Sequence, residues 1–312
     1  MRATVIVPAF NAAATIGRTL DALARQSGAG EFETIVVDDG STDDTVAIAR
    51  AAPGVRVLTQ RQGGAAAARN RGAAEASGEV LAFTDSDCMP TPGWLAAGLR
   101  ALADADVVQG RVTPPPGVAL GPFDRSLWIE RETGLWETAN LLVRRELFER
   151  VGGFEGWLEH GGGRPMAEDT WFGWRARRAG ARTAYCAEAL VHHEVFPRGP
   201  LGFVQERERL RYFPAIARQM PELRDEVLYR RWFLTRRTAA FDAAVAGLAL
   251  AAWRRSPLPL AAAGPYAAIA AGEALAWGRR RAPAVAAVRL AADAVGLAAL
   301  LEGSVRHRSP LA

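Results

Sequence analysis

The segment EVLAFTDSDC, residues Glu79–Cys88, decides the fold class of this chain. Its apolar run Val80–Phe83 follows a glycine and is typical of a buried strand. Asp85 and Asp87 come directly after the run, at the edge where a parallel α/β sheet binds its ligands. Two carboxylates this close repel each other unless a cation lies between them, and Mg²⁺ or Mn²⁺ held with a diphosphate is the usual solution. The segment therefore predicts an α/β fold with a divalent-cation site.

Strand and helix patterns alternate through the first 110 residues. Strands are expected at residues 4–7, 32–37, 55–58, 80–83 and 106–110, with helices from 16 to 23, after 41, at 65–76 and at 94–102. Asn11 is expected to cap the first helix, and the first strand is expected to end at Pro8. Further on, residues 139–143, 183–185 and 190–192 favour strands, and 144–150 and 168–179 favour helices. This alternation predicts right-handed crossovers and a mostly parallel sheet with helices on both faces.

Composition excludes several kinds of chemistry. The chain has 312 residues and is 49% hydrophobic, enough for one large domain or a domain with an appendage. Its two cysteines, Cys88 and Cys186, lie far apart, which argues against a disulfide framework and against a thiolate zinc site. The sequence contains no lysine, so mechanisms that require one are excluded.

The composition changes after Pro197. Residues 201–237 are expected to form a basic amphipathic helical linker, and residues 238–312 an apolar helical region. From 197 to 312 there are 18 arginines and 9 acidic residues, and the arginines separate long apolar stretches. This pattern favours an anionic membrane surface as partner rather than nucleic acid. Helices that span the bilayer, helices that lie in its interface and a soluble helical hairpin all remain open, because Asp242, Glu273, Arg289 and Asp293 interrupt the apolar segments.

Six segments in a fixed order resemble the family 2 glycosyltransferases, which have the GT-A fold, a Rossmann-like mixed sheet. They are VIVPAFN (5–11), DDGSTDDT (38–45), GGAAAARNRG (63–72), TDSDC (84–88), NLLVRRELFERVGGF (140–154) and AEDTWFGWRARRAG (167–180). The resemblance covers about residues 3–200, which would be the catalytic domain. It is specific as a set, although no single segment is. The bacterial type with apolar C-terminal helices is the nearest in pattern.

The resemblance implies a role for particular residues. The residues that would bind the donor nucleotide are Pro8, Ala9, Asn11, Asp38, Asp39, Arg69 and Asp85. Asp87 and Asp85 would bind Mn²⁺ or Mg²⁺, with His192 as a further ligand. The acceptor side would contain Gly152, Gly153, Phe154 and Trp171, and the catalytic pair would be Asp169 and Glu168. Asp169 would be the base that takes the acceptor proton, and the neighbouring Glu168 favours a raised pKa for it.

The resemblance thus implies an inverting, metal-dependent enzyme that moves a sugar from a nucleoside-diphosphate sugar to a hydroxyl of a glycan or lipid-linked acceptor. A metal beside the diphosphate offsets the charge that develops on the leaving group, and a single displacement inverts the anomeric carbon. UDP is the first candidate for the donor nucleotide, with GDP and dTDP as alternatives. The expected location is the cytoplasmic face of the cell membrane.

Several residues also have purely structural interpretations. Asp43 and Asp44 fit turn and helix-cap positions, Arg69 fits a helix surface, and Glu168 with Asp169 fits the first turn of a helix. His193 is as good a candidate metal ligand as His192, Trp171 and Trp174 are typical of helix packing, and Gly152-Gly153 is typical of a turn. The glycines at 161–163 suggest a loop that closes over the substrates. An inactive membrane-associated module that binds sugar nucleotides or glycans, and less readily a sugar nucleotidyltransferase, are the alternative functions.

Overall fold

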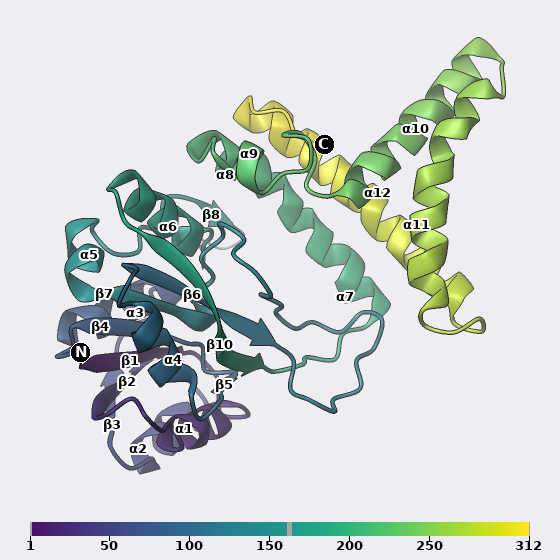
Figure 1. Ribbon diagram of the computed structural model, residues 1–312. Helices are drawn as coiled ribbons and strands as arrows, with labels where there is room; N and C mark the ends of the chain where they lie inside the picture. Colours follow the sequence, from purple (N-terminus) through teal and green to yellow (C-terminus); the bar gives the residue numbers. More distant parts are fainter. Residues whose placement is uncertain (1, 161–163, 312) are drawn as a thin grey trace. The chain divides into compact units, whose positions relative to one another are not determined.

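The computed structural model describes residues 2–160 and 164–311, in two compact units (Figure 1). The first unit contains residues 1–119 and 126–196, and the second contains residues 120–125 and 197–312. The three glycines from which a closing loop was predicted lie outside the described residues.

An eight-stranded sheet organises the first unit. Its strands are β1 (Ala3–Ala9), β2 (Phe32–Asp38), β3 (Val55–Thr59), β4 (Val80–Phe83), β5 (Cys88–Pro90), β6 (Val107–Thr113), β7 (Leu141–Arg144) and β10 (Thr183–His193). They lie in the order β3-β2-β1-β4-β7-β6-β10-β5. The neighbours β3, β2, β1 and β4 are parallel, whereas β7 is antiparallel to both β4 and β6, and β5 is antiparallel to β10. The sheet is therefore mixed, with a parallel half at β1–β4. A separate two-stranded sheet pairs β8 (Glu159–His160) with β9 (Arg164–Pro165).

Helices cover both faces of the sheet, because successive strand residues point to opposite sides. Along β1, Val5 and Val7 belong to the main apolar core with α1 (Ile16–Ala24), α2 (Thr45–Ala51) and α4 (Trp94–Ala101). Ile6 points to the other face, where α3 (Ala65–Glu75) packs so closely that a Cβ at Gly72 would lie 2.6 Å from an Ile6 methyl. The helices α5 (Arg145–Arg150) and α6 (Glu168–Arg178) share that face through Phe148 and Phe172, which contact each other with ring centroids 5.2 Å apart.

The structure differs from the sequence-based expectation at several places. The strand β1 continues through Pro8 to Ala9. Asn11 does not cap α1: its φ is +48°, and the residue before the helix is Thr15. The short strand β5 was not predicted. The two predicted strand pieces at 183–192 form one strand, β10, whose pairing with β6 is irregular between Cys186 and Leu190.

The second unit is helical. It contains α7 (Pro200–Gln205), the 3₁₀ segment η2 (Glu206–Tyr212), α8 (Phe213–Gln219), α9 (Leu223–Glu226), α10 (Arg236–Arg254), η3 (Leu258–Ala263), α11 (Gly264–Leu275) and α12 (Ala282–His307). Thr235 and Thr238 form a reciprocal capping box that starts α10. Among the described residues, α12 is the one helix long and apolar enough to cross a membrane, and 28% of its most apolar stretch is buried. Length and composition alone do not decide between a span and a packed helix.

Candidate active site

The carboxyl ends of β1, β2 and β4 meet at one edge of the sheet and carry most of the predicted donor residues. Asp38 is the last residue of β2 and Asp39 follows it, and they are 3% and 4% exposed, respectively. The Asp38 carboxylate accepts hydrogen bonds from the backbone N–H groups of Gly40 (3.2 Å) and Ser41 (3.3 Å). The Asp39 carboxylate accepts from Gly63 and Gly64, each at 2.8 Å, and so ties the glycine-rich segment before α3 to the end of β2. Both aspartates therefore build the walls of this edge.

The loops after β1 and β2 are cross-linked by side chains. Asn11 follows the β1 residues Pro8 and Ala9, and its Oδ1 accepts a hydrogen bond from the backbone N–H of Thr42 (2.8 Å). Asp43 accepts from the backbone N–H groups of Thr45 and Ala13, both at 3.1 Å, as its turn interpretation predicts. Two of these bonds fix the two loops to each other. Asn11 of the first loop accepts from Thr42 of the second, and Asp43 of the second loop accepts from Ala13 of the first.

Arg69 joins two motifs that are far apart in the sequence. This residue of α3 is 6% exposed, so it is not the surface charge that its position in a helix also allowed. Its Nη2 donates to Oδ1 of Asp85 at 2.7 Å, and its Nη1 lies 3.6 Å from Oε1 of Glu168. Burial lowers the pKa of Arg69, but the carboxylates of Asp85 and Glu168 outweigh burial, and the pKa lies above its usual value. One guanidinium thus holds the Asp-x-Asp loop and the start of α6 together.

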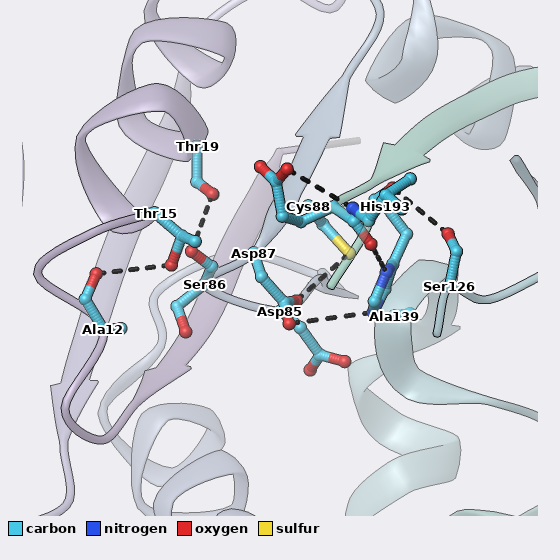
Figure 2. Close-up of polar contacts among 12 residues, drawn as sticks. Ala12, Thr15, Thr19, Asp85, Ser86, Asp87, Cys88, Ser126, Ala139 and His193 are labelled. Atoms are coloured by element: carbon cyan, nitrogen blue, oxygen red, sulfur yellow. Dashed lines mark hydrogen bonds and ion pairs between the residues drawn. The ribbon is translucent and has the colours of Figure 1, made fainter. Parts of the chain in front are cut away.

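Asp87 lies opposite a histidine. Because Cys88 of β5 pairs with His193 of β10, the preceding Asp87 is brought to the same end of the strand pair. The Asp87 Oδ2 and the His193 Nε2 are 3.7 Å apart (Figure 2). The backbone N–H of Glu194 donates to the Asp87 carbonyl at 2.9 Å and fixes this register, and Thr19 donates to the carbonyl of Ser86 between the two aspartates at 3.0 Å.

The histidine beside Asp87 is not His192, for which a metal role was predicted. The His192 Nδ1 contacts Thr113 Oγ1 at 3.2 Å. Its ring belongs to the next position along β10, and successive side chains of a strand point to opposite sides. Both histidines were candidates from the sequence, and the pairing of β5 with β10, which was not foreseen, places His193 beside Asp87.

The tautomer of His193 favours a cation at this place. Its Nδ1 lies 2.7 Å from the carbonyl oxygen of Glu194, which only accepts, so Nδ1 carries the proton. In the neutral ring, Nε2 therefore presents a lone pair toward the Asp87 carboxylate. This arrangement, with the second nitrogen donating to a backbone carbonyl, is typical of histidines that bind metals. Asp87 Oδ2 and His193 Nε2, 3.7 Å apart, are the two atoms that would hold a divalent cation here.

Cys88 is the third side chain of this cluster. It is fully buried, and burial together with the charges of Asp85 and Asp87 raises the pKa of its thiol well above the usual value. Its Sγ–H donates to Asp87 Oδ1 at 3.8 Å. Because the thiolate is the form that binds metals, the oxygen and nitrogen of Asp87 and His193 are the donors that suit Mn²⁺ or Mg²⁺ here.

Asp169 is the candidate base. It lies in the first turn of α6, after Ala167 with its φ of +60°, and its Oδ1 accepts from the backbone N–H of Thr170 at 2.7 Å. Burial, then the charges of Glu168 and Glu137, raise the pKa of Asp169 to about 7. Glu137, whose own pKa is raised by burial, was missed because it lies in the irregular stretch 112–137, where the sequence has no clear pattern. A carboxylate with such a pKa suits proton transfer near neutral pH.

The residues predicted for the acceptor side lie in a turn, in the core and at a partly exposed position. Gly152 and Gly153 have φ angles of +82° and +65° and form the turn after α5. Phe154 is 3% exposed and packs against Phe83 with ring centroids 5.1 Å apart, so its side chain belongs to the core and not to an acceptor surface. Trp171 is partly exposed, and its Nε1 donates to Glu155 at 3.0 Å. Trp171 is therefore the one of these side chains that can reach a substrate.

Comparison with known proteins tests the family that the sequence motifs suggest. Residues 4–156 match the family described as Glycosyl transferase family 2. Over 214 residues the chain is 33% identical to the glycosyltransferase AglE of Haloferax volcanii, an alignment that covers 64% of this chain and 68% of AglE. This chain belongs to glycosyltransferase family 2. A further relative, the pre-mycofactocin glycosyltransferase of Mycobacterium tuberculosis, is 30% identical over 213 residues, covering 61% of this chain and 42% of that protein.

Solved structures share the GT-A fold. The mannosyltransferase PcManGT of Pyrobaculum calidifontis, in complex with GDP-Man and Mn²⁺, matches with a TM-score of 0.59 at 22% identity, over 95% of this chain and 86% of that one. Residues 1–349 of TarS from S. aureus, in complex with UDP-GlcNAc, match with a TM-score of 0.54 at 21% identity, over 99% and 93% of the two chains. The predicted fold class and family are confirmed, and the protein is a glycosyltransferase.

Proposed function

We propose that this glycosyltransferase is inverting and metal-dependent, and that it moves a sugar from a nucleoside-diphosphate sugar to a hydroxyl of a glycan or lipid-linked acceptor. The observation that carries the proposal is the pair of contacts made by Arg69, to Asp85 and to Glu168. Through these contacts, Arg69 joins two groups in one site. One group suits a diphosphate and its cation, and the other contains the residue that suits a base.

Each residue has a distinct role in this scheme. Asp87 and His193 would hold Mn²⁺ or Mg²⁺, and the cation would offset the charge on the departing diphosphate. Asp85, bound by Arg69, faces the ribose or the cation, and the edge formed by Asp38 and Asp39 receives the nucleoside. Asp169 removes the proton of the acceptor hydroxyl, and because attack then occurs opposite the leaving group, one displacement inverts the anomeric carbon.

The donor is proposed to carry UDP, with GDP and dTDP as alternatives. Fold neighbours bound to UDP-GlcNAc and to GDP-Man with Mn²⁺ support a nucleotide sugar but not one particular base. Mass-action stabilisation by a panel of UDP-, GDP- and dTDP-sugars, each with Mn²⁺ or EDTA, would identify the base. Metal-dependent binding without turnover of any donor would favour an inactive module over an active enzyme.

The product of turnover tests inversion. With an α-linked donor, we expect a β-linked product in the NMR spectrum of the first turnover, formed with Mn²⁺ and not with EDTA. A product of retained configuration would contradict the single displacement and leave Asp169 without the proposed role.

We further propose that the enzyme works at the cytoplasmic face of the cell membrane. The α10–η3 corner of the helical unit supports this, because Trp253 and Leu258 are 78% and 82% exposed beside Arg254 and Arg255. Exposed apolar side chains next to cations suit an anionic lipid interface.

Vesicle sedimentation tests the membrane proposal. The double variant Trp253→Ser/Leu258→Ser is expected to bind phosphatidylglycerol vesicles at least about tenfold more weakly, since each buried apolar side chain contributes roughly 1.5–3 kcal/mol. Leu201→Ser, which removes another exposed leucine (69%), is the matched control and should bind as the unchanged protein does. Equal binding of all three proteins would exclude this corner as the lipid contact.

A further inference from the structure

The helical unit encloses a cavity of about 260 Å³ that is separate from the transfer site. Its apolar lining comes from four segments, α7, η2, α10 and α12, and from the residue that precedes the α10 cap: Phe203, Leu210, Leu234, Phe241, Leu297 and Leu300. The volume is close to the lower end of that of small-molecule sites, which are mostly apolar with a few placed polar groups. The cavity therefore has the size and lining to take a short apolar chain.

Most charges in this cavity neutralise one another. Arg237 of α10 donates to both oxygens of Asp293, to Oδ1 at 3.2 Å and to Oδ2 at 2.6 Å, and to Glu273 at 2.7 Å. Glu273 also pairs with Arg289, and the Tyr266 hydroxyl donates to Asp293 at 2.7 Å. These contacts join α10, α11 and α12 and account for the charges that interrupt the apolar segments. They are structural, because each carboxylate and each guanidinium in the set has a partner of opposite sign.

Arg207 is different. It lines the cavity from η2, and its guanidinium lies over the ring of Phe203, 4.9 Å from the centroid. Among the described residues, no carboxylate forms an ion pair with Arg207. Burial lowers the pKa of Arg207, and the more distant charges of Asp293 and Glu206 offset this only in part. A partly buried guanidinium without an ion-pair partner suits an anionic ligand.

A hydrogen-bond acceptor in the same cavity is also without a partner. The Asp242 Oδ2 is buried and makes no hydrogen bond within the described part of the chain. Burial, then the charge of Asp293, raises the pKa of Asp242 to about 6. An O–H group of a bound ligand would satisfy Asp242, and an anionic oxygen, such as that of a phosphate monoester, would supply the counter-ion that Arg207 lacks.

We propose that this cavity binds the head group and first carbons of a single-chain alkyl phosphate, with Arg207 contacting the phosphate and the apolar lining contacting the chain. The site is outside the sugar-transfer machinery. The proposal therefore does not depend on the donor, metal or acceptor proposed above.

Calorimetry on the full chain, with octyl phosphate below its micelle concentration, tests this. We expect saturable binding of octyl phosphate. Octanol and inorganic phosphate should each bind at least about tenfold more weakly, because octanol lacks the phosphate and inorganic phosphate lacks the alkyl chain. Arg207→Gln should weaken octyl phosphate about tenfold or more, since it removes a hydrogen bond between charged groups. Arg209→Gln is the matched control, because Arg209 lies on the same 3₁₀ segment but is exposed and outside the cavity lining.

Further outcomes separate support from refutation. Binding of octanol as tight as that of octyl phosphate, or equal losses in Arg207→Gln and Arg209→Gln, would overturn the proposal. Binding to phosphatidic acid vesicles that depends on Arg207 would assign the ligand to the bilayer, whereas binding of the monomeric ester alone would assign it to a soluble phosphate ester; both would support the site.

Discussion

Replacing Asp169 with asparagine is expected to lower kcat by about 10²–10⁴-fold, the range typical of a lost general base. Asparagine keeps the shape of the side chain and its acceptor oxygen for the Thr170 N–H. It cannot take a proton, so the acceptor hydroxyl would have to attack while still protonated. Donor binding should change little, because the contacts of Arg69 with Asp85 and Glu168 remain. Initial rates and donor affinity, measured on the same preparation, separate the two effects.

The pH dependence of kcat/KM gives a second test of the role of Asp169. The base acts when ionised, and the pKa of Asp169 is raised to about 7 by burial and then by Glu168 and Glu137. The kcat/KM of the unchanged enzyme should therefore rise about tenfold per pH unit below 7 and level off above it. Asp169→Asn should lose this limb. Glu137→Gln should move the limb to lower pH, because it removes a negative charge that disfavours ionisation of Asp169.

Glu146→Gln is the control for these variants. Glu146 is a carboxylate with a 91% exposed side chain, and its loss should leave both rate and pH profile unchanged. Near-normal transfer by Asp169→Asn would show that the base is another residue. If the pH profile of kcat/KM is unshifted in Glu137→Gln, Glu137 does not influence the titration of Asp169.

The sequence was most informative where function follows from local position. The parallel strands ending at Ala9, Asp38 and Phe83 could be predicted because an apolar run followed by polar residues specifies both a strand and its ligand edge. The two contacts of Arg69 could not be predicted from a helix position alone. They depend on how α3 packs against the sheet and on where α6 begins, which are long-range consequences of the fold.

The choice between His192 and His193 shows the same limit. Strand alternation makes certain that only one of two neighbouring histidines faces a given site. Which one faces Asp87 depends on the pairing of β5 with β10, and β5 has only three residues, too few to carry a periodic pattern. In the helical unit, Glu273, Arg289 and Asp293 interrupt the apolar segments of the sequence. The structure pairs these charges across α10, α11 and α12, which the sequence alone could not predict.

The second large effect is expected for Asp87→Ala, which should weaken Mn²⁺-dependent donor binding by at least about 100-fold, more than a typical loss of a residue that only orients a metal ligand. Asp85 is a poor substitute for the lost carboxylate, because its Oδ1 is held by Arg69 at 2.7 Å. Thermal shift and calorimetry with the nucleotide sugar, in Mn²⁺ and in EDTA, measure the loss. The difference between the two conditions, rather than binding itself, should disappear in the variant.

His193→Gln should reduce the same difference by a smaller factor, since the amide can still offer one oxygen to a cation but not the imidazole nitrogen that lies 3.7 Å from Asp87. Asp21→Ala, the loss of an exposed aspartate on α1, is the matched control. If Asp87→Ala kept full Mn²⁺-dependent binding, the cation would be held elsewhere, and the Asp87–His193 contact would be an ordinary ion pair of a protonated histidine. In that case His193→Gln should destabilise the fold equally with and without Mn²⁺, so the two variants together decide between a metal site and a structural contact.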